Sequence, residues 1–304
     1  MSLKTVTIPG KTFMFGEYAI LEGGTCLGIG TKPVFDFDDH AHDKKQIIHE
    51  QSPAGRYVKK IQVDAPDLKI DEIDHEQLGV HMHNPYQVGG FGASTAEFLY
   101  FYLKYSKVKN IQHCFDTYRS LYEGSREQPS GMDVVTQLCG GLSLNYRSNN
   151  LVIHQKIDWS IQGVDFVICS TGLKVKTHEH LAELDRKLCL NLVDLSHQLG
   201  SLVRSADRLA FFEGLDLWMQ KLKESQLTHP LILDLKQEVE ALAKQQGLSF
   251  FKCKPCGALG ADVVILFYLS DEAAVFRSFF DQNLASRLKI QASLASLQSG
   301  PLQV

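Results

Sequence analysis

The sequence predicts an α+β protein with two domains. In each half of the chain, short runs with strand-like alternation come before helical segments, which is typical of α+β rather than doubly wound folds. The chain has 304 residues, 44% of them hydrophobic, so it can fill two cores. We place the domain boundary near residue 160, which gives domains 1–160 and 161–304.

The first half opens with a β-rich layer. Apolar and polar residues alternate in several short runs, which predicts strands over 6–8, 12–15, 34–37, 47–49 and 58–63. Helices are expected over 93–108, a segment rich in aromatic residues, over 111–122 and over 133–140, where two glycines follow. Residues 142–146 and 151–155 then predict a hairpin with a turn at 147–150.

The second half repeats the order of strand before helix. An apolar strand is expected over 165–170, and helical periodicity dominates 177–246 with a break near 228–230. The chain then returns to a strand, a helix and a strand, over 261–268, 271–282 and 286–293. No repeat or low-complexity tract interrupts this pattern.

Charge and hydropathy exclude several kinds of partner. The chain has 31 basic and 35 acidic residues with no long block of one sign, so nucleic acid is not an expected partner. No apolar stretch approaches the roughly 20 residues of a membrane-spanning helix, and the N-terminus lacks the pattern of a signal peptide. We therefore expect a cytoplasmic protein without membrane association, either a monomer or a homodimer.

The seven cysteines predict reduced thiols in the core. Their number is odd, their contexts are mostly apolar, and a chain of this length needs no disulfide framework. Cys253 and Cys256 form a Cys-x-x-Cys pair, for which a metal or redox role is an alternative. We disfavour that role because a structural zinc site needs four ligands and the chain has no second pair.

Three glycine-containing segments, far apart in the chain, indicate phosphate chemistry. They read PGKTFMFGEY at 9–18, GGFGASTA at 89–96 and KPCGALGAD at 254–262. We expect each to be a turn beside an apolar run, and such turns let backbone N–H groups approach an anion closely. We call them the first, second and third glycine segments.

Taken in order, these segments resemble those of the GHMP kinases, a superfamily named for galactokinase, homoserine kinase, mevalonate kinase and phosphomevalonate kinase. The resemblance spans almost the whole chain. It implies an N-terminal α+β domain with the nucleotide loop and a ferredoxin-like C-terminal domain, with the site in the cleft between them. It also implies ATP and Mg²⁺ as cofactors and a small molecule as substrate.

The resemblance assigns catalytic roles to Lys11 and Asp133. A fixed cation at Lys11 would lower the pKa of the acceptor hydroxyl and offset charge in the transition state. Asp133, in the segment PSGMD at 129–133, would accept or orient the hydroxyl proton. Taken alone, Lys11 also fits a solvent-facing lysine in a Pro-Gly turn, and Asp133 an aspartate favoured by a helix dipole.

The second segment matches the nucleotide loop of this superfamily. The resemblance assigns five of its residues to the ATP phosphates: Gly90, Gly92, Ala93, Ser94 and Thr95. Ser94 and Glu123 would bind magnesium, although Glu123 is one residue closer to Asp133 than mevalonate kinases lead us to expect. The pair Ser94 and Glu97 also fits a capping box, in which Ser94 only caps the helix.

The third segment and the end of the first would contact the substrate. The resemblance assigns this role to Glu17, Gly257 and Ala258. Leu259 and Ala261 stand where glycines are common in the superfamily. These departures, together with Ala93, leave a second hypothesis open: a GHMP-fold protein that binds a nucleotide or metabolite without transferring phosphate.

Different segments of the sequence favour different acceptor molecules. Residues 16–18 and the third segment look more like phosphomevalonate kinases, whereas 129–133 and the short chain look like mevalonate kinases. We slightly favour mevalonate, in isoprenoid precursor synthesis, with phosphomevalonate as the alternative. A phosphorylated acceptor would need further cations, and Lys32, Arg126 and Lys174 are the candidates that the sequence offers.

Overall fold

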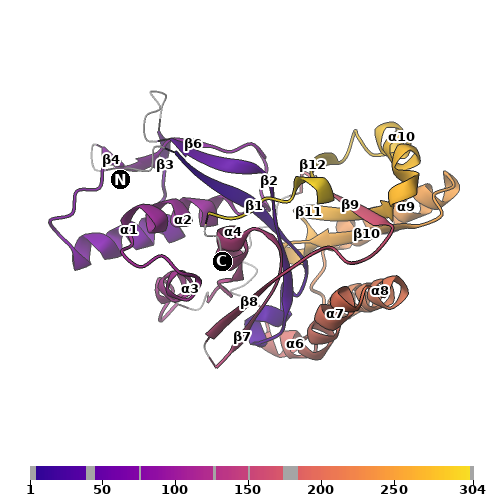
Figure 1. The fold of residues 1–304 in the computed structure, drawn as a ribbon, viewed down its shortest axis with the longest axis horizontal. Helices are drawn as coiled ribbons and strands as arrows, with labels where there is room; N and C mark the ends of the chain where they lie inside the picture. Colours follow the sequence, from indigo (N-terminus) through magenta and orange to yellow (C-terminus); the bar gives the residue numbers. More distant parts are fainter. Residues whose placement is uncertain are drawn as a thin grey trace.

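Figure 1 shows the computed structural model of the chain, which describes residues 5–38, 45–74, 77–125, 128–149, 151–173 and 184–301. Two halves lie side by side, each with its own antiparallel sheet. The N-terminal half runs from indigo to magenta in Figure 1, and the C-terminal half from rose through orange to yellow. The α+β class that the sequence predicts is confirmed.

The N-terminal half is built on a sheet with the order β1-β2-β7-β8, and β6 pairs with β2. Its strands are β1 (Thr5–Phe15), β2 (Cys26–Asp38), β6 (Met82–His83), β7 (Gly141–Ser148) and β8 (Leu151–Ile157), and a smaller sheet contains β3 (Gln46–Ile47), β4 (Ile73–Asp74) and β5 (Gln77–Val80). Its helices are η1 (Ala19–Glu22), α1 (Pro53–Asp64), α2 (Ala93–Tyr105), α3 (Ile111–Ser120) and α4 (Met132–Cys139). Helices α2 and α4 pack against β1, while α1 packs on α2 and α3 on α4.

The C-terminal half has a four-stranded sheet with the order β10-β11-β9-β12. Its strands are β9 (Val164–Ser170), β10 (Phe251–Cys256), β11 (Val263–Leu269) and β12 (Lys289–Ser293). Its helices are α6 (Arg186–Leu190), α7 (Val193–Ser205), α8 (Arg208–Glu224), α9 (Pro230–Gln245), η2 (Ala258–Gly260), η3 (Ser270–Glu272), α10 (Ala273–Asn283) and η4 (Leu294–Ser296). Strand β9, the helices, the β10–β11 hairpin, α10 and β12 follow one another as in a ferredoxin-like fold, which confirms the prediction.

One predicted strand is wrong. Residues 58–63 belong to α1, which begins after Ser52, whose side chain accepts a hydrogen bond from the backbone N–H of Gly55. Pro53 takes the first helical position, where its missing N–H costs nothing. Tyr57, Val58 and Ile61 then face the core at helical spacing, and this spacing outweighs the strand-like alternation.

The first glycine segment is also not a turn where we expected one. Pro9 and Gly10 lie inside the continuous strand β1, which pairs with β2 and shifts register between these two residues. A Cβ on Gly10 would lie 2.0 Å from the hydroxyl oxygen of Tyr86, so glycine is needed for close packing. The Pro-Gly pair therefore marks a β-bulge that holds Lys11 within a rigid strand.

The two halves share an apolar core and are also joined by backbone hydrogen bonds near the C-terminus. One apolar cluster contains Ile8 and Phe35 from the first sheet together with Phe166 and Phe267 from the second. The chain near its C-terminus returns to the first sheet, where the backbone of Gln298 bonds with Gly30 and Gly141. The division into domains 1–160 and 161–304 stays a prediction.

The cysteines and the helices bear on two further expectations. All seven cysteines are buried and unpaired, as expected for core thiols. Within the described ranges, no helix has both the length and the apolar character needed to cross a bilayer.

Candidate active site

Lys11 and Asp133, the two residues predicted to be catalytic, form an ion pair. Lys11 lies on β1 and Asp133 in the first turn of α4, and Lys11 Nζ is 2.8 Å from Asp133 Oδ1. The two side chains are 15% and 35% exposed, so a small molecule can reach both. The structure thus joins residues that are more than a hundred positions apart in the chain.

The second glycine segment is fixed directly beside this pair. The backbone N–H of Lys11 donates to the carbonyl of Phe91 at 3.0 Å. Gly92 has a positive φ of +85°, and a Cβ there would lie 3.0 Å from Lys11 Cγ and 3.1 Å from the amide of Gln137. Gln137, on α4, donates to the carbonyl of Pro9 at 2.8 Å. Strand β1, the loop and α4 therefore form one unit.

Helix α2 begins in this loop with an open N-terminus. Gly92 is its N-cap, and no side chain caps the helix. Ala93 is therefore the first helical residue, and Ser94 is exposed in the first turn. The first N–H groups of a helix have no partner within it and carry the positive end of its dipole, so this end suits a phosphate group.

The capping-box interpretation of Ser94 and Glu97 is wrong. A capping box would require Ser94 to be the N-cap, but that position is Gly92. Glu97 is instead buried, and Gln46 donates to its Oε1 at 3.2 Å. Burial raises the pKa of Glu97 to about 7. Thr95, next to Ser94, is buried as well.

The second and third glycine segments meet at Asp262. Gly90 has a φ of +91°, and a Cβ there would lie 2.6 Å from Asp262 Cβ. Gly257 has a φ of +88°, and a Cβ there would lie 3.2 Å from Asp262 Oδ2. Ala258 follows Gly257 and opens the short helix η2. The C-terminal half therefore contributes its turn to the same region as the nucleotide loop.

A second ion pair, Lys254 with Glu17, joins the two halves. Lys254 Nζ is 2.6 Å from Glu17 Oε1, and the side chains are only 1% and 7% exposed. Burial alone would lower the pKa of Lys254, but Cys256 and Glu17 beside it raise it above its ordinary value. Glu17, predicted to bind substrate, therefore has one carboxylate oxygen engaged, while Oε2 has no hydrogen-bond partner among the described residues.

Tyr18 makes a second link to the third segment. Its hydroxyl accepts a hydrogen bond from the backbone N–H of Leu259 at 2.9 Å. Leu259 has a φ of +51°, a left-handed conformation that glycine adopts more readily. The leucine that departs from the family pattern thus keeps a glycine-like backbone, held in part by this bond.

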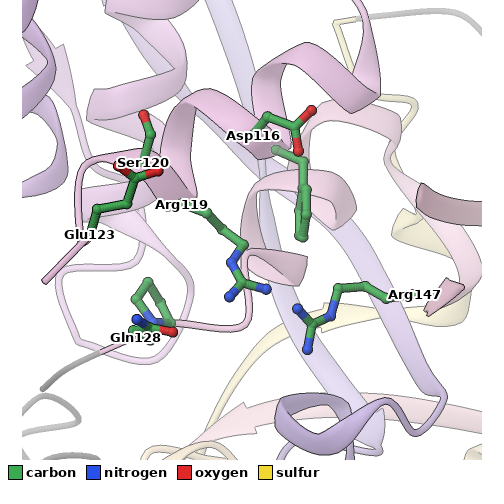
Figure 2. Close-up of a pocket in the computed structure, with 8 residues that line it drawn as sticks. Asp116, Arg119, Ser120, Glu123, Gln128 and Arg147 are labelled. Carbon is green, nitrogen blue, oxygen red and sulfur yellow. The ribbon is translucent and has the colours of Figure 1, made fainter. Parts of the chain in front are cut away.

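Glu123, the predicted magnesium carboxylate, lines a cavity that lies apart from the second glycine segment (Figure 2). This cavity of about 350 Å³ is lined by Phe115, Asp116, Arg119, Ser120, Glu123, Gln128, Pro129 and Arg147. None of these residues belongs to the second glycine segment, so the structure does not place Glu123 and Ser94 in one cavity. The described part of the chain contains no cluster of three or more His, Cys, Asp or Glu side chains that could hold a metal.

Comparison with known proteins finds likeness in structure only. No protein-family model matches the chain, and no curated protein sequence matches it significantly. Solved structures do match: the fold defined here is that of the GHMP kinases.

Three solved structures represent these matches. The Leishmania major mevalonate kinase in complex with R-mevalonate covers 100% of this chain and 98% of its own, with a TM-score of 0.62 and 13% identity. The Streptococcus pneumoniae phosphomevalonate kinase in complex with phosphomevalonate and AMPPNP covers 95% and 98%, with a TM-score of 0.67 and 12% identity. The Lactococcus lactis galactokinase in complex with galactose covers 99% and 95%, with a TM-score of 0.63 and 13% identity.

Proposed function

We propose that this protein is an ATP-dependent kinase that phosphorylates a small molecule of the mevalonate type. The observation that carries this proposal is the reachable Lys11–Asp133 pair, bonded through β1 to the loop that opens α2. A phosphate-binding helix end beside a paired lysine and aspartate is what phosphoryl transfer requires, because that reaction depends mainly on positioning and electrostatics.

In the proposed reaction an acceptor oxygen attacks the γ-phosphorus of ATP, and the bond from that phosphorus to the oxygen shared with ADP breaks. Asp133 takes the proton when the acceptor is a hydroxyl. The ammonium of Lys11 stabilises negative charge on the attacking oxygen. The backbone N–H groups at the start of α2, in Gly92, Ala93 and Ser94, hold the phosphates of ATP.

Mg²⁺ would accompany ATP and neutralise charge on the phosphates. It usually takes only one or two protein oxygens together with phosphates and water. The exposed hydroxyl of Ser94 has suitable chemistry, and we propose it as such a ligand. Glu123, the carboxylate expected from the sequence, lines a cavity that contains no residue of the second glycine segment.

Two acceptors are proposed, mevalonate and phosphomevalonate, because solved structures with this fold include kinases of both. The third glycine segment and Glu17, Gly257 and Ala258 would form the acceptor side of the site. The hypothesis of a binding protein without catalysis is less favoured, since such a protein has no need for a reachable Lys–Asp pair beside the loop.

A coupled assay of ADP release tests the proposal. Purified protein with ATP and Mg²⁺ is given mevalonate, phosphomevalonate, homoserine or one of several sugars in turn. We expect ADP release with one of the first two and none with the others. Measurable ATP binding without ADP release for any acceptor would instead support the binding-protein hypothesis.

A further inference from the structure

Another cavity lies where the two halves of the molecule meet. It has a volume of about 640 Å³. Strand β2 contributes Lys32 and Pro33 to its lining, and the C-terminal half contributes residues of β9, β11, α10, β12 and η4. Strand β12 packs against β2 at this place (Figure 1). None of the described lining residues belongs to a glycine segment. We call this space the junction cavity.

One wall of the junction cavity is apolar and firmly packed. Val167 and Phe276 are buried, and Ile290 packs against the same apolar cluster. The rings of Tyr268 and Phe276 stack with their centroids 3.9 Å apart and their planes 2° apart. A cavity of this size, with an apolar wall and a few polar groups, is typical of binding sites for small organic molecules.

Each half of the molecule contributes one cation to the junction cavity. Lys32 lies on β2 and Arg277 on α10, and both side chains are exposed. Neither makes a hydrogen bond or an ion pair with another described residue, and none of the described lining residues is acidic. The chain as a whole has a formal charge of −4, so two uncompensated cations in one cavity are a local exception that attracts anions.

Tyr268 adds a hydrogen-bond donor beside Arg277. Burial raises the pKa of Tyr268, the charge of Asp165 raises it further, and the charge of Arg277 lowers it. Asp165 pairs with Tyr268 across β9 and β11 but does not line the cavity. The phenol is therefore protonated at neutral pH, and its hydroxyl makes no hydrogen bond with the other described residues. It is available to donate to a bound molecule.

The backbone that carries Lys32 is held in place by the first sheet. The pairing of β1 with β2 skips Lys32 and Pro33, which form a bulge opposite the register shift at Pro9 and Gly10. The hydroxyl of Tyr86 donates a hydrogen bond to the carbonyl of Pro33 and so fixes this bulge. A cation on a fixed backbone loses less conformational freedom when it binds an anion.

We propose that the junction cavity binds a small organic anion, with its acidic group between Lys32 and Arg277 and its apolar part on the wall that contains Phe276. Carboxylates and phosphates share the required chemistry, because a guanidinium fork matches the oxygens of both. This site is separate from the Lys11–Asp133 pair and does not depend on the proposed kinase activity. An anion held by both cations would bridge the two halves.

Lys32 is one of the three cations that the sequence offers for a phosphorylated acceptor. The structure places it in a cavity whose described lining residues include neither Lys11 nor Asp133. The other two candidates, Arg126 and Lys174, lie outside the described residues. Lys32 therefore serves better as part of a second site than as part of the acceptor site.

Ligand-observed NMR titrations with phenyl phosphate and with benzoate test the proposal, because each probe joins an acidic group to an apolar ring. We expect the parent protein to bind at least one of them, and which one it prefers distinguishes a phosphate from a carboxylate site. Lys32→Gln and Arg277→Gln should each weaken this binding by about fivefold or more. Lys59→Gln and Arg208→Gln, at exposed cations outside the cavity, are the matched controls and should leave it unchanged.

Thermal melts give a second measurement. A saturating concentration of the bound probe should raise the melting temperature of the parent, but not that of the double variant Lys32→Gln with Arg277→Gln. Three outcomes would overturn the proposal. The first is that the parent, with its fold verified by circular dichroism, binds neither probe. The second is that Lys11→Ala abolishes binding while Lys32→Gln and Arg277→Gln do not, which would place the probe in the candidate active site. The third is that inorganic phosphate, which has no apolar part, binds as tightly as phenyl phosphate.

Discussion

Two lysine–carboxylate pairs of this protein have the same chemistry but different surroundings. Lys11–Asp133 has a separation of 2.8 Å and side chains that are 15% and 35% exposed. Lys254–Glu17 has a separation of 2.6 Å and side chains that are 1% and 7% exposed. Both pairs involve residues on or just after β1, but the side chains of the first pair are much more exposed than those of the second.

The two pairs differ mainly in burial, which changes what each charge contributes. Lys254 and Glu17 link β10 to the end of β1, so this pair fixes one half of the molecule against the other. Taking both charges out of water is costly, and only their close contact offsets that cost. Lys11 and Asp133 lie within one half and keep part of their hydration, so a substrate can replace water there.

The largest expected effect concerns activity at the reachable pair. Asp133→Asn or Lys11→Ala should lower turnover by about a thousandfold, because each removes a group that acts on the acceptor oxygen. The melting temperature should change little, since partly exposed pairs contribute about 0–1 kcal/mol. Steady-state kinetics and thermal melts measure both, with the exposed Asp216→Asn as control. Near-normal turnover in either variant would contradict the proposed roles of Lys11 and Asp133 in phosphoryl transfer.

The buried pair should show the opposite behaviour. Lys254→Met leaves Glu17 buried without its cation, so the free energy of unfolding should fall by about 3–5 kcal/mol. Urea denaturation measures this, and the double variant Lys254→Met with Glu17→Gln should recover part of the loss. Lys252→Met, which breaks the more exposed pair with Asp216, is the control and should cost about 1 kcal/mol or less. Equal losses at Lys252 and Lys254 would contradict the distinction.

Glu97 is a third case to compare with the two pairs. It is a buried carboxylate that forms no ion pair with a lysine among the described residues. Its pKa is raised by burial from 4.5 to about 7. As the pH rises through this window, the unfolded chain loses the proton first, so Glu97 lowers stability increasingly and reaches its full effect above pH 7. Glu97→Gln should therefore stabilise the protein at pH 8 by on the order of 3 kcal/mol, as an upper value, and hardly at pH 4.5.

Denaturation curves for Glu97→Gln and the parent at several pH values measure this effect. The exposed Glu213→Gln provides a control that should show no such pH dependence. A stability difference that is the same at pH 4.5 and pH 8 would mean that folding does not raise the pKa of Glu97.

The smallest expected effect concerns the neutral link beside the buried pair. Tyr18→Phe removes the acceptor for the N–H of Leu259, which should lower the free energy of unfolding by about 1 kcal/mol. The effect should be less than that of Lys254→Met, since no charge is left uncompensated. Tyr146→Phe is the control, because the Tyr146 hydroxyl makes no hydrogen bond with the described residues. If Tyr18→Phe lowered the free energy of unfolding more than Lys254→Met does, the expected ranking of the buried ion pair above the neutral hydrogen bond would be wrong.

Most elements of the fold follow from local patterns in the sequence. The aromatic helix α2, the β7–β8 hairpin and the closing strand, helix and strand lie close to where the periodicity predicts them. The exceptions have local causes of their own: Ser52 and Pro53 start a helix at α1, and Gly10 allows a bulge where a turn was expected. In these cases two patterns compete, and packing against the core decides between them.

The sequence by itself determined the α+β class and the order of the glycine segments, and the family resemblance of these segments and of residues 129–133 led to the choice of Lys11 and Asp133. These features depend on residue type and on spacing along the chain. Hydrophobic periodicity predicts helices and strands, and the conformational freedom of glycine predicts turns. Only the tertiary structure decided which lysine faces which carboxylate, and that Arg119 and Arg147 line one cavity. Such groupings arise from contacts between segments distant in sequence, and burial, which sets the strength of each charge interaction, exists only once those segments pack together.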